Sequence, residues 1–277
     1  MDKGILYLVG TPIGNLGDIS SRVLDILEEV DFIAAEDTRN TLKLLNHFNI
    51  KKPLVSYYEH NKMQKGEELL QRLSNGETCA LVTDAGMPAI SDPGEDIVKK
   101  CHENDIKVSV IPGPCAFVCA LALSGFPSKR FTFEGFLETD KKERKEHLEG
   151  LTLEKRTMIF YEAPHKLLST LIDMEKTFSN REVAIIKEIT KIYENVNITT
   201  LSEAIKYYNE ISPKGEYVII LKGSEEKENN PLNNLSINDH IAFYTEKGFS
   251  NMDALKAVAK DRGLRKNEIY KLQLEEK

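Results

Sequence analysis

The chain has 277 residues, with 44 acidic and 37 basic side chains and a formal net charge of −7 at pH 7. An apolar fraction of 41% beside a charged fraction of 29% is typical of a folded chain and excludes an intrinsically disordered one. The acidic balance argues against a protein that coats nucleic acid without selectivity, although it leaves room for local basic patches.

Short β-branched or aromatic runs alternate along the chain with longer amphipathic segments. In chain order, strands are predicted at residues 5–9, 32–35, 54–57, 79–83, 108–111, 157–161, 183–187 and 217–221. Between them, apolar side chains recur at helical spacing, as Ile97, Val98 and Cys101 do. This alternation predicts an α/β fold in which helices cover both faces of a largely parallel sheet.

Segments poor in apolar residues indicate where the chain divides. Pro112-Gly113-Pro114 cannot continue a strand or a helix, and the charged run at 225–231 cannot bury apolar area. The segment 136–156 is also dense in charge and is expected to form an exposed loop and helix. The expected domains are an N-terminal α/β domain (1–113), a second α/β domain (114–223), a linker (224–235) and a small helical module (236–277).

The small module is expected to be a helix-turn-helix. Ser250 and Asp253 have the spacing of a capping pair. Met252, Leu255 and Val258 form an apolar stripe, Gly263 ends the first helix, and a second helix carries Ile269, Tyr270 and Leu272. An ordinary helical hairpin with a solvated face is the alternative.

No stretch of the sequence is suited to a membrane, a secretory signal or a metal. The longest apolar stretch, 115–126, is interrupted by Ser124 and Gly125 and is shorter than the roughly 20 residues that a membrane helix needs. The first residues lead into a strand rather than a secretory signal. The histidines show no ligand spacing, so we expect a cytoplasmic chain without a metal site. Its four thiols are expected to be reduced and mostly in the core: Cys79, Cys101, Cys115 and Cys119.

Two loops rich in small residues follow predicted strands. The first, 10–16, is neither a Walker loop nor G-x-G-x-x-G, and a plain tight turn is the alternative to a binding loop. In the second, 84–94, Asp92 is expected to be a helix N-cap and Pro93 the first helical residue. Capping leaves the eight preceding residues unexplained. Small residues allow a ligand to approach the backbone, and Asp84 can accept hydrogen bonds from one.

Charged clusters also follow predicted strands. Glu36-Asp37-Thr38-Arg39 is either a capped helix start with an ion pair or part of a catalytic site, and His165 is either a first-turn helix residue or a ligand contact. No G-x-S-x-G elbow occurs, so a serine hydrolase is poorly supported.

Six segments in order carry a family resemblance: 8–16, 36–39, 83–94, 111–116, 133–136 and 162–166. Together they resemble the tetrapyrrole-methylase-type S-adenosylmethionine methyltransferases, and more narrowly the bacterial 16S rRNA cytidine 2′-O-methyltransferases. The similarity runs from about Ile5 to Leu221 and continues weakly beyond. Met87 and Cys115 stand where the family has hydroxyl side chains, so backbone contacts are expected there.

The resemblance implies two α/β halves with S-adenosylmethionine in a cleft between them, and S-adenosylhomocysteine as product. It implies that the cofactor is bordered by Pro12, Asp84, Gly86, Met87, Ile90, Ser91, Cys115, Ala116 and Tyr161, with Pro213 and Gly215 as weaker candidates. A ribose hydroxyl is a weak nucleophile and needs a base. The catalytic candidates, which the sequence does not rank, are Glu36, Asp37 and Glu162, with Arg39 beside them.

An RNA substrate requires local basic residues rather than a positive chain. The expected RNA contacts are Lys141, Lys142, Arg144, His165, Lys166, Arg265 and Lys266, with Lys145, Lys256, Lys260 and Arg262 close to them in sequence. The resemblance further implies 16S rRNA within the 30S subunit as partner and a homodimer, without a membrane. The alternatives are a methyltransferase of corrinoid or porphyrin precursors and a non-catalytic ribosome-binding factor.

Overall fold

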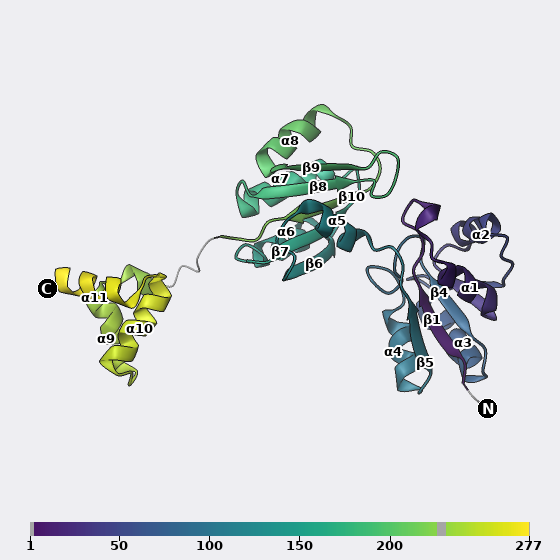
Figure 1. Cartoon of the computed structure of the whole chain (residues 1–277), viewed down its shortest axis with the longest axis horizontal. Helices are drawn as coiled ribbons and strands as arrows, with labels where there is room; N and C mark the ends of the chain where they lie inside the picture. The colour runs from purple at the N-terminus through teal and green to yellow at the C-terminus, as the bar shows by residue number, and fades with distance from the viewer. Residues whose placement is uncertain (1–2, 226–230, 277) are drawn as a thin grey trace. The chain divides into compact units, whose positions relative to one another are not determined.

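The computed structural model describes residues 3–225 and 231–276. The chain divides into two compact units, of which the larger extends to Ser224 and the smaller begins at Glu225 (Figure 1). This division falls at the start of the linker expected over 224–235, of which residues 226–230 lie outside the described residues.

The first half of the large unit is a fully parallel five-stranded sheet with the order β3-β2-β4-β1-β5. Its elements are β1 (Ile5–Val9), α1 (Ser21–Glu29), β2 (Phe32–Ala35), α2 (Thr38–His47), β3 (Leu54–Ser56), α3 (Lys62–Ser74), β4 (Cys79–Val82), α4 (Glu95–Glu103) and β5 (Lys107–Ile111). One face packs against α3 and α4 through Leu69 and Ile97, and the other against α1 and α2 through Leu27 and Leu45. Helices therefore cover both faces, as expected.

The second half is a mixed sheet with the order β6-β7-β10-β8-β9. Its elements are α5 (Ala116–Ser124), β6 (Phe131–Phe136), α6 (Lys141–Gly150), β7 (Thr157–Glu162), α7 (Leu167–Phe178), β8 (Glu182–Lys187), β9 (Asn195–Thr200), α8 (Leu201–Glu210) and β10 (Tyr217–Leu221). Only β6 and β7 are parallel, and the other three pairs are antiparallel. The expectation of a largely parallel sheet is therefore wrong for this half, because β8 and β9 form a hairpin too short for a crossover helix.

All eight predicted strands are confirmed, and two further strands were not predicted. β6 ends at Phe136, where the segment expected to form an exposed loop and helix begins, and a register shift between Phe133 and Gly135 interrupts the alternation of its side chains. β9 is a polar edge strand with the sequence NVNITT. Neither strand has the continuous apolar run by which buried strands are recognised.

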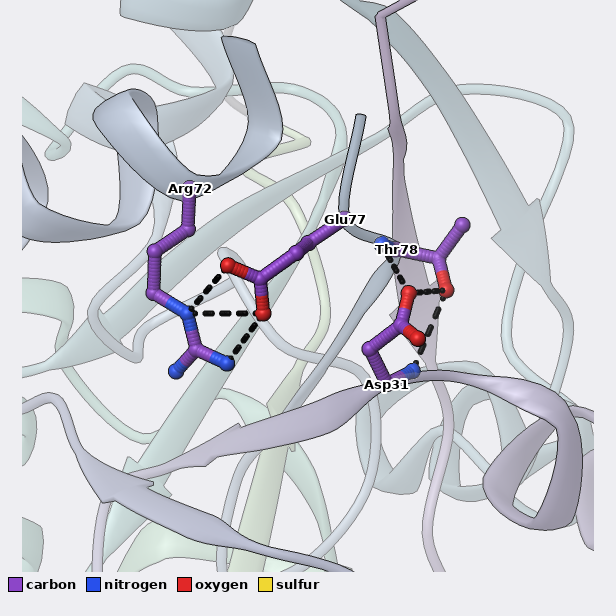
Figure 2. A network of polar contacts seen from close by, with 4 residues as sticks. All are labelled: Asp31, Arg72, Glu77 and Thr78. Carbon is purple, nitrogen blue, oxygen red and sulfur yellow. Dashed lines mark hydrogen bonds and ion pairs between the residues drawn. The ribbon is translucent and has the colours of Figure 1, made fainter. Parts of the chain in front are cut away.

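A polar network joins the amino ends of β2 and β4 (Figure 2). Asp31 accepts hydrogen bonds from the backbone N–H of Thr78 at 2.7 Å and from its hydroxyl at 2.8 Å, and these bonds lower the pKa of Asp31. Arg72 pairs with Glu77 at 2.5 Å and lies over the ring of Phe32 at 3.4 Å. The network fixes the end of the sheet opposite the loops discussed below.

The described residues of the small unit form three helices, α9 (Ile237–Glu246), α10 (Asn251–Arg262) and α11 (Lys266–Glu275), preceded by a 3-10 turn at Pro231–Asn234. The sequence predicted only the last two. Ser250 caps α10 by accepting from the backbone N–H of Asp253 at 3.2 Å, and Gly263 ends it in the left-handed region (φ 63°), as expected. Met252 is exposed, so the predicted apolar stripe is wrong at that position.

Candidate active site

The two loops rich in small residues meet at the carboxyl edge of the first sheet. Thr11 and Gly86 exchange backbone hydrogen bonds, Thr11 N to Gly86 O at 2.9 Å and Gly86 N to Thr11 O at 3.1 Å. The Thr11 hydroxyl also donates to the Thr83 carbonyl at 3.2 Å. Because the carboxyl ends of parallel strands share one edge, loops distant in sequence form one surface there.

A close backbone approach adds a third loop to this edge. The backbone N–H of Gly10 donates to the Ile111 carbonyl at 3.1 Å. A Cβ on Gly10 would lie 2.6 Å from Gly113 Cα and 2.7 Å from Met87 Sδ. Only glycine fits at this position, so Gly10 and Gly113 set the spacing between the loops after β1 and β5.

The loop between β4 and α4 has an unusual backbone. Ala89 and Ser91 have φ angles of 66° and 62°, and Gly94 has one of 148°. Non-glycine residues in this region cost about 1 to 3 kcal/mol each and are frequent at functional sites. The N-cap of α4 is Gly94, so the expectation that Asp92 caps the helix and Pro93 starts it is wrong. The turn at Gly94 separates Asp92 from the helix.

A cavity of about 340 Å³ is lined by side chains of both halves of the large unit. Seven of the nine predicted cofactor residues line it: Gly86, Met87, Ile90, Ser91, Cys115, Ala116 and Tyr161. Ala85 lies in the predicted binding loop, and the lining residues Glu162, Ala163 and Pro164 lie in the predicted segment 162–166. The sequence predicted no cofactor contact for the remaining lining residues, which are Ile13, Asp92, Phe136, Ile189, Glu216, Tyr217 and Val218. Pro213 and Gly215 are absent from the lining, but Glu216 follows them directly. The loops of the first half and strands β7 and β10 of the second therefore enclose one site.

The other two predicted cofactor residues, Pro12 and Asp84, line a second hollow of similar volume. It lies against α2 and includes Asn40, Lys43 and His47. Asn40 donates to the Asp84 carboxylate at 3.0 Å. Thr83 and Asp84 face this hollow, whereas Ala85 and Gly86 face the cavity. The stretch 83–86 therefore forms a wall between the two spaces.

Tyr161 fixes the start of α5 at the cavity. Its hydroxyl oxygen accepts from the backbone N–H of Phe117 at 3.1 Å, and its ring packs against Phe133 and Phe136 at centroid distances of 5.1 and 5.4 Å. Burial raises the pKa of Tyr161 to about 12, so the phenol stays neutral. Cys115 is the N-cap of α5 and makes no side-chain capping bond, and together with Ala116 it brings the start of this helix to the cavity lining.

Acidic side chains meet at the wall between the two spaces. The hydroxyl of Thr83 donates to the Glu36 carboxylate at 2.8 Å. Asp92 is half-buried, and its pKa is raised to about 6, first by burial and then by the charge of Glu36, against a hydrogen bond from Thr83 that lowers it. The sequence pattern did not identify Asp92 as a functional residue, because Asp-Pro-Gly before a helix has the appearance of a cap.

The remaining catalytic candidates make structural contacts. Asp37 caps α2 by accepting from the backbone N–H of Arg39 at 2.8 Å, and the Arg39 guanidinium pairs with it at 2.6 Å. These hydrogen bonds lower the pKa of Asp37 to about 2. Glu162 lines the cavity but accepts from the backbone N–H of Ala163 at 2.8 Å and from the Thr170 hydroxyl at 2.5 Å. These contacts match the capping interpretation for Asp37, and catalytic roles for Asp37, Arg39 and Glu162 stay predictions.

The predicted RNA contacts lie in several settings. Lys141 and Lys142 are exposed in the first turn of α6, whereas Arg144 is largely buried against Asp173 of α7. His165 is exposed before α7, and Lys166 donates to the Thr139 hydroxyl at 3.1 Å. Arg265 and Lys266 lie at the start of α11 in the small unit. RNA binding by all seven residues stays a prediction. The ion pair of Arg144 with Asp173 also joins α6 to α7.

His147 connects α6 to β6 and to the segment that follows it. Its ring nitrogens lie 3.2 Å from Glu134 and 3.0 Å from Glu138. Burial lowers its pKa, but the two carboxylates outweigh burial and raise the pKa overall. A raised folded-state pKa gives stability that is present below the unfolded pKa and is lost as the pH rises through the folded value.

The His147→Gln variant is therefore expected to lose about 0.5–1 kcal/mol of unfolding free energy at pH 6 and less at pH 8. Urea unfolding at both pH values measures the difference. His102→Gln, at an exposed position on α4, is the matched control and is expected to show no such pH dependence. An equal loss at both pH values would contradict the role of the carboxylates.

Comparison with known proteins agrees with this architecture. The family profile "Tetrapyrrole (Corrin/Porphyrin) Methylases" matches residues 5–205. Among solved structures, diphthine synthase superposes with a TM-score of 0.62 at 15% identity, covering 79% of this chain and 90% of the other. Uroporphyrin-III-C-methyltransferase from Thermus thermophilus superposes with a TM-score of 0.56 at 18% identity, covering 79% of this chain and 94% of the other. At these identities the superpositions show the fold alone.

The chain belongs to the tetrapyrrole methylase family, a class of methyltransferases. Its sequence is 49% identical to "Ribosomal RNA small subunit methyltransferase I" of Halalkalibacterium halodurans, over 99% of this chain and 96% of the relative. The protein of the same name from Bacillus subtilis is 44% identical, over 97% of this chain and 94% of the relative. Among the described helices, none combines the length and apolar character that crossing a bilayer requires. Residues 3–225 and 231–276 contain no cluster of His, Cys, Asp and Glu suited to a metal ion.

Proposed function

We propose that this chain transfers a methyl group from S-adenosylmethionine to the ribose 2′-hydroxyl of a cytidine in small-subunit ribosomal RNA, with the 30S subunit as substrate. The observation that carries the proposal is the cavity built from small-residue loops at the carboxyl edge of the first sheet. The nearly full-length similarity to small-subunit rRNA methyltransferases supports the substrate class.

The cavity suits the cofactor in size and chemistry. Its volume of about 340 Å³ lies within the usual range for small-molecule sites. Ile13, Ile90 and Ile189 offer apolar contacts, and the start of α5, where Cys115 and Ala116 line the cavity, carries the positive end of a helix dipole that favours a carboxylate. The bound cofactor supplies a methyl group on a positively charged sulfonium, and the carboxylates of Asp92 and Glu216 in the lining favour that charge.

The second hollow is the proposed place for the acceptor nucleotide. Lys43 and His47 line it and can meet a phosphate, and the exposed Arg39 lies in the first turn of the same helix. The stretches 11–14 and 83–86 each contribute residues to this hollow and to the cavity, so the two spaces are neighbours. Holding both reactants in near-attack geometry can supply about 7–11 kcal/mol of the barrier, so positioning by these loops is the main catalytic contribution of the fold.

A cytoplasmic homodimer is part of the same proposal. Large apolar side chains are exposed on the edge strand β5 and on α5, namely Val110, Val118 and Leu123. Exposed apolar groups of this kind often mark a protein interface. Lys141 and Lys142 on the large unit, and Arg265 and Lys266 on the small unit, are proposed to contact RNA phosphates.

Three measurements on the full chain test the proposed function. Calorimetric titration with S-adenosylmethionine and S-adenosylhomocysteine is expected to show binding of both. Tritium from labelled S-adenosylmethionine is expected in 30S particles from a strain that lacks the gene, and not in 30S particles from the parent strain. Mapping of ribose methylation is expected to find one cytidine that loses its methyl group on deletion of the gene and regains it on complementation.

The alternatives give different results. Absence of heat with either nucleoside would contradict the proposal and leave a ribosome-binding factor. Tritium in a porphyrin or corrin precursor, with none in 30S particles, would show that the chain methylates small macrocycles instead of RNA.

A further inference from the structure

The loop between β8 and β9, residues 188–194, holds two apolar side chains out in water. Ile192 is 95% exposed and Tyr193 is 74% exposed, and they are the two most exposed large apolar side chains among the described residues. The side chain of Tyr193 has no aromatic or hydrogen-bond partner within residues 3–225 and 231–276. We call Ile192 and Tyr193 the tip of the β8–β9 loop.

The loop that carries this tip is fixed in place. Lys191 is paired with Glu188 at 3.0 Å and with Glu216 at 2.8 Å. The backbone N–H of Thr190 donates to the Glu194 carboxylate at 2.6 Å. Glu188 and Thr190 have positive φ angles of 52° and 65°, a conformation that is costly for non-glycine residues and frequent at functional sites. The fold therefore maintains a strained loop in order to hold the tip in a defined position.

The loop also contacts the first half of the large unit. The Thr190 hydroxyl donates to the Asp18 carboxylate at 2.5 Å, and Asp18 ends the 3-10 turn Leu16–Asp18. The aliphatic part of Lys191 lies against Gly14, because a Cβ on Gly14 would be 2.4 Å from Lys191 Cε. The β8–β9 loop is therefore attached to the segment that follows β1.

These contacts bring the loop to both spaces of the site. Ile189, in the same loop, lines the cavity. Gly14 and Leu16, in the segment that the loop contacts, line the second hollow. When the acceptor nucleotide occupies the hollow, the nucleotides next to it in the RNA strand are therefore within reach of the tip.

The surroundings of the tip favour RNA over a protein partner. Lys43 and His47 line the hollow, and Lys214 is exposed on the loop before β10, so cations are available to phosphates. A stable protein interface buries about 800 Å² on each partner, which two side chains among charged neighbours do not supply. A base needs only one face of an exposed aromatic ring, and Tyr193 offers one.

We propose that the tip of the β8–β9 loop binds the RNA strand beside the acceptor nucleotide, with an unpaired base stacked on the ring of Tyr193. The inference rests on the proposed methylation of ribosomal RNA and names a part of the chain that orients the strand. Stacking on an aromatic ring tolerates every base. Tyr193 is therefore a substrate-binding residue that contributes affinity and alignment, and it takes no part in proton or methyl transfer.

Steady-state methylation of 30S particles from a strain that lacks the gene tests the role of the ring. Tyr193→Ala is expected to raise the KM for 30S particles by about 5-fold to 100-fold. The value of kcat and the Kd for S-adenosylmethionine are expected to stay within about threefold of the wild type. Tyr193→Phe keeps the ring and is expected to keep the wild-type KM. Tyr207→Ala, at an exposed tyrosine of α8, is the matched control and is expected to behave as the wild type does.

A photoreactive side chain identifies what lies on the tip. The full chain with p-azidophenylalanine in place of Tyr193 is irradiated in the presence of the same 30S particles. A crosslink to 16S rRNA is expected, because a stacked base lies in direct contact with the ring. The same replacement at Tyr207 is the control, and it is expected to give no crosslink to RNA.

The outcomes separate this inference from the proposed function. If the wild type methylates 30S particles and Tyr193→Ala raises the KM less than about fivefold, the role of the tip is overturned and the proposed function stands. Absence of a crosslink to rRNA would also overturn it, whether the crosslink forms with a ribosomal protein, with a second copy of this chain or not at all. An equal loss of S-adenosylmethionine affinity would assign the loop to the cofactor instead. If the wild type transfers no methyl group to 30S particles, the proposed function itself fails.

Discussion

Replacement of Gly10 by alanine is expected to lower the free energy of unfolding by about 2–4 kcal/mol and to abolish binding of S-adenosylmethionine. The added Cβ would lie 2.6 Å from Gly113 Cα and 2.7 Å from Gly113 N, which are backbone atoms that cannot rotate away. Relief requires the loops after β1 and β5 to separate, and this movement displaces Met87 from the cavity lining.

Urea unfolding and calorimetric titration measure the two effects of Gly10→Ala. The matched control is Gly150→Ala at the end of α6, where an added Cβ meets no atom within 4 Å. That control is expected to be neutral or to gain up to about 1 kcal/mol from helix propensity. If Gly10→Ala unfolded at the same midpoint urea concentration as the wild type, this result would contradict the close approach of Gly10 and Gly113.

Replacement of Ala116 by leucine is expected to raise the Kd for S-adenosylmethionine by about 100-fold or more while the chain stays folded. Ala116 is the first residue of α5 and lines the cavity, so three added carbon atoms occupy space needed by the cofactor. A 100-fold change corresponds to about 2.7 kcal/mol of binding free energy, a reasonable cost for blocking part of a site of this size.

Calorimetric titration and thermal unfolding separate loss of binding from loss of folding in Ala116→Leu. Ala122→Leu places the same side chain at an exposed position of the same helix, so it controls for the change in helix propensity and is expected to bind as the wild type does. If Ala116→Leu binds S-adenosylmethionine with unchanged affinity, the cofactor does not occupy this cavity.

The sequence predicted the strands better than the relations between them. Buried parallel strands such as β2 and β4 consist of short apolar runs that are visible in the sequence. The antiparallel order of the second sheet depends on β9, whose polar composition matches an edge position and lacks such a run. Periodicity therefore identified elements, but it did not identify their neighbours or their direction.

The candidate site was predicted in outline from the small-residue loops and strand ends. The pattern does not show which side of a loop a residue faces. Pro12 and Asp84, which the resemblance predicts to border the cofactor, line the second hollow, and their contact with the cofactor stays a prediction. Asp92 was missed because an Asp-Pro-Gly sequence before a helix matches a capping signal. The positive φ angle of Ser91 and the cap at Gly94 are backbone properties that arise only in the folded loop.

The order of strands in the first sheet has a consequence for synthesis on the ribosome. β1 lies between β4 and β5, and it pairs with no strand nearer in sequence. About 100 residues separate its end from the end of β5, so at synthesis rates of about 5–20 residues per second its apolar side chains wait on the order of 5–20 s for their second neighbour. During that interval the nascent chain presents an unpaired hydrophobic segment, which makes β1 the natural point of contact for a chaperone that acts during translation.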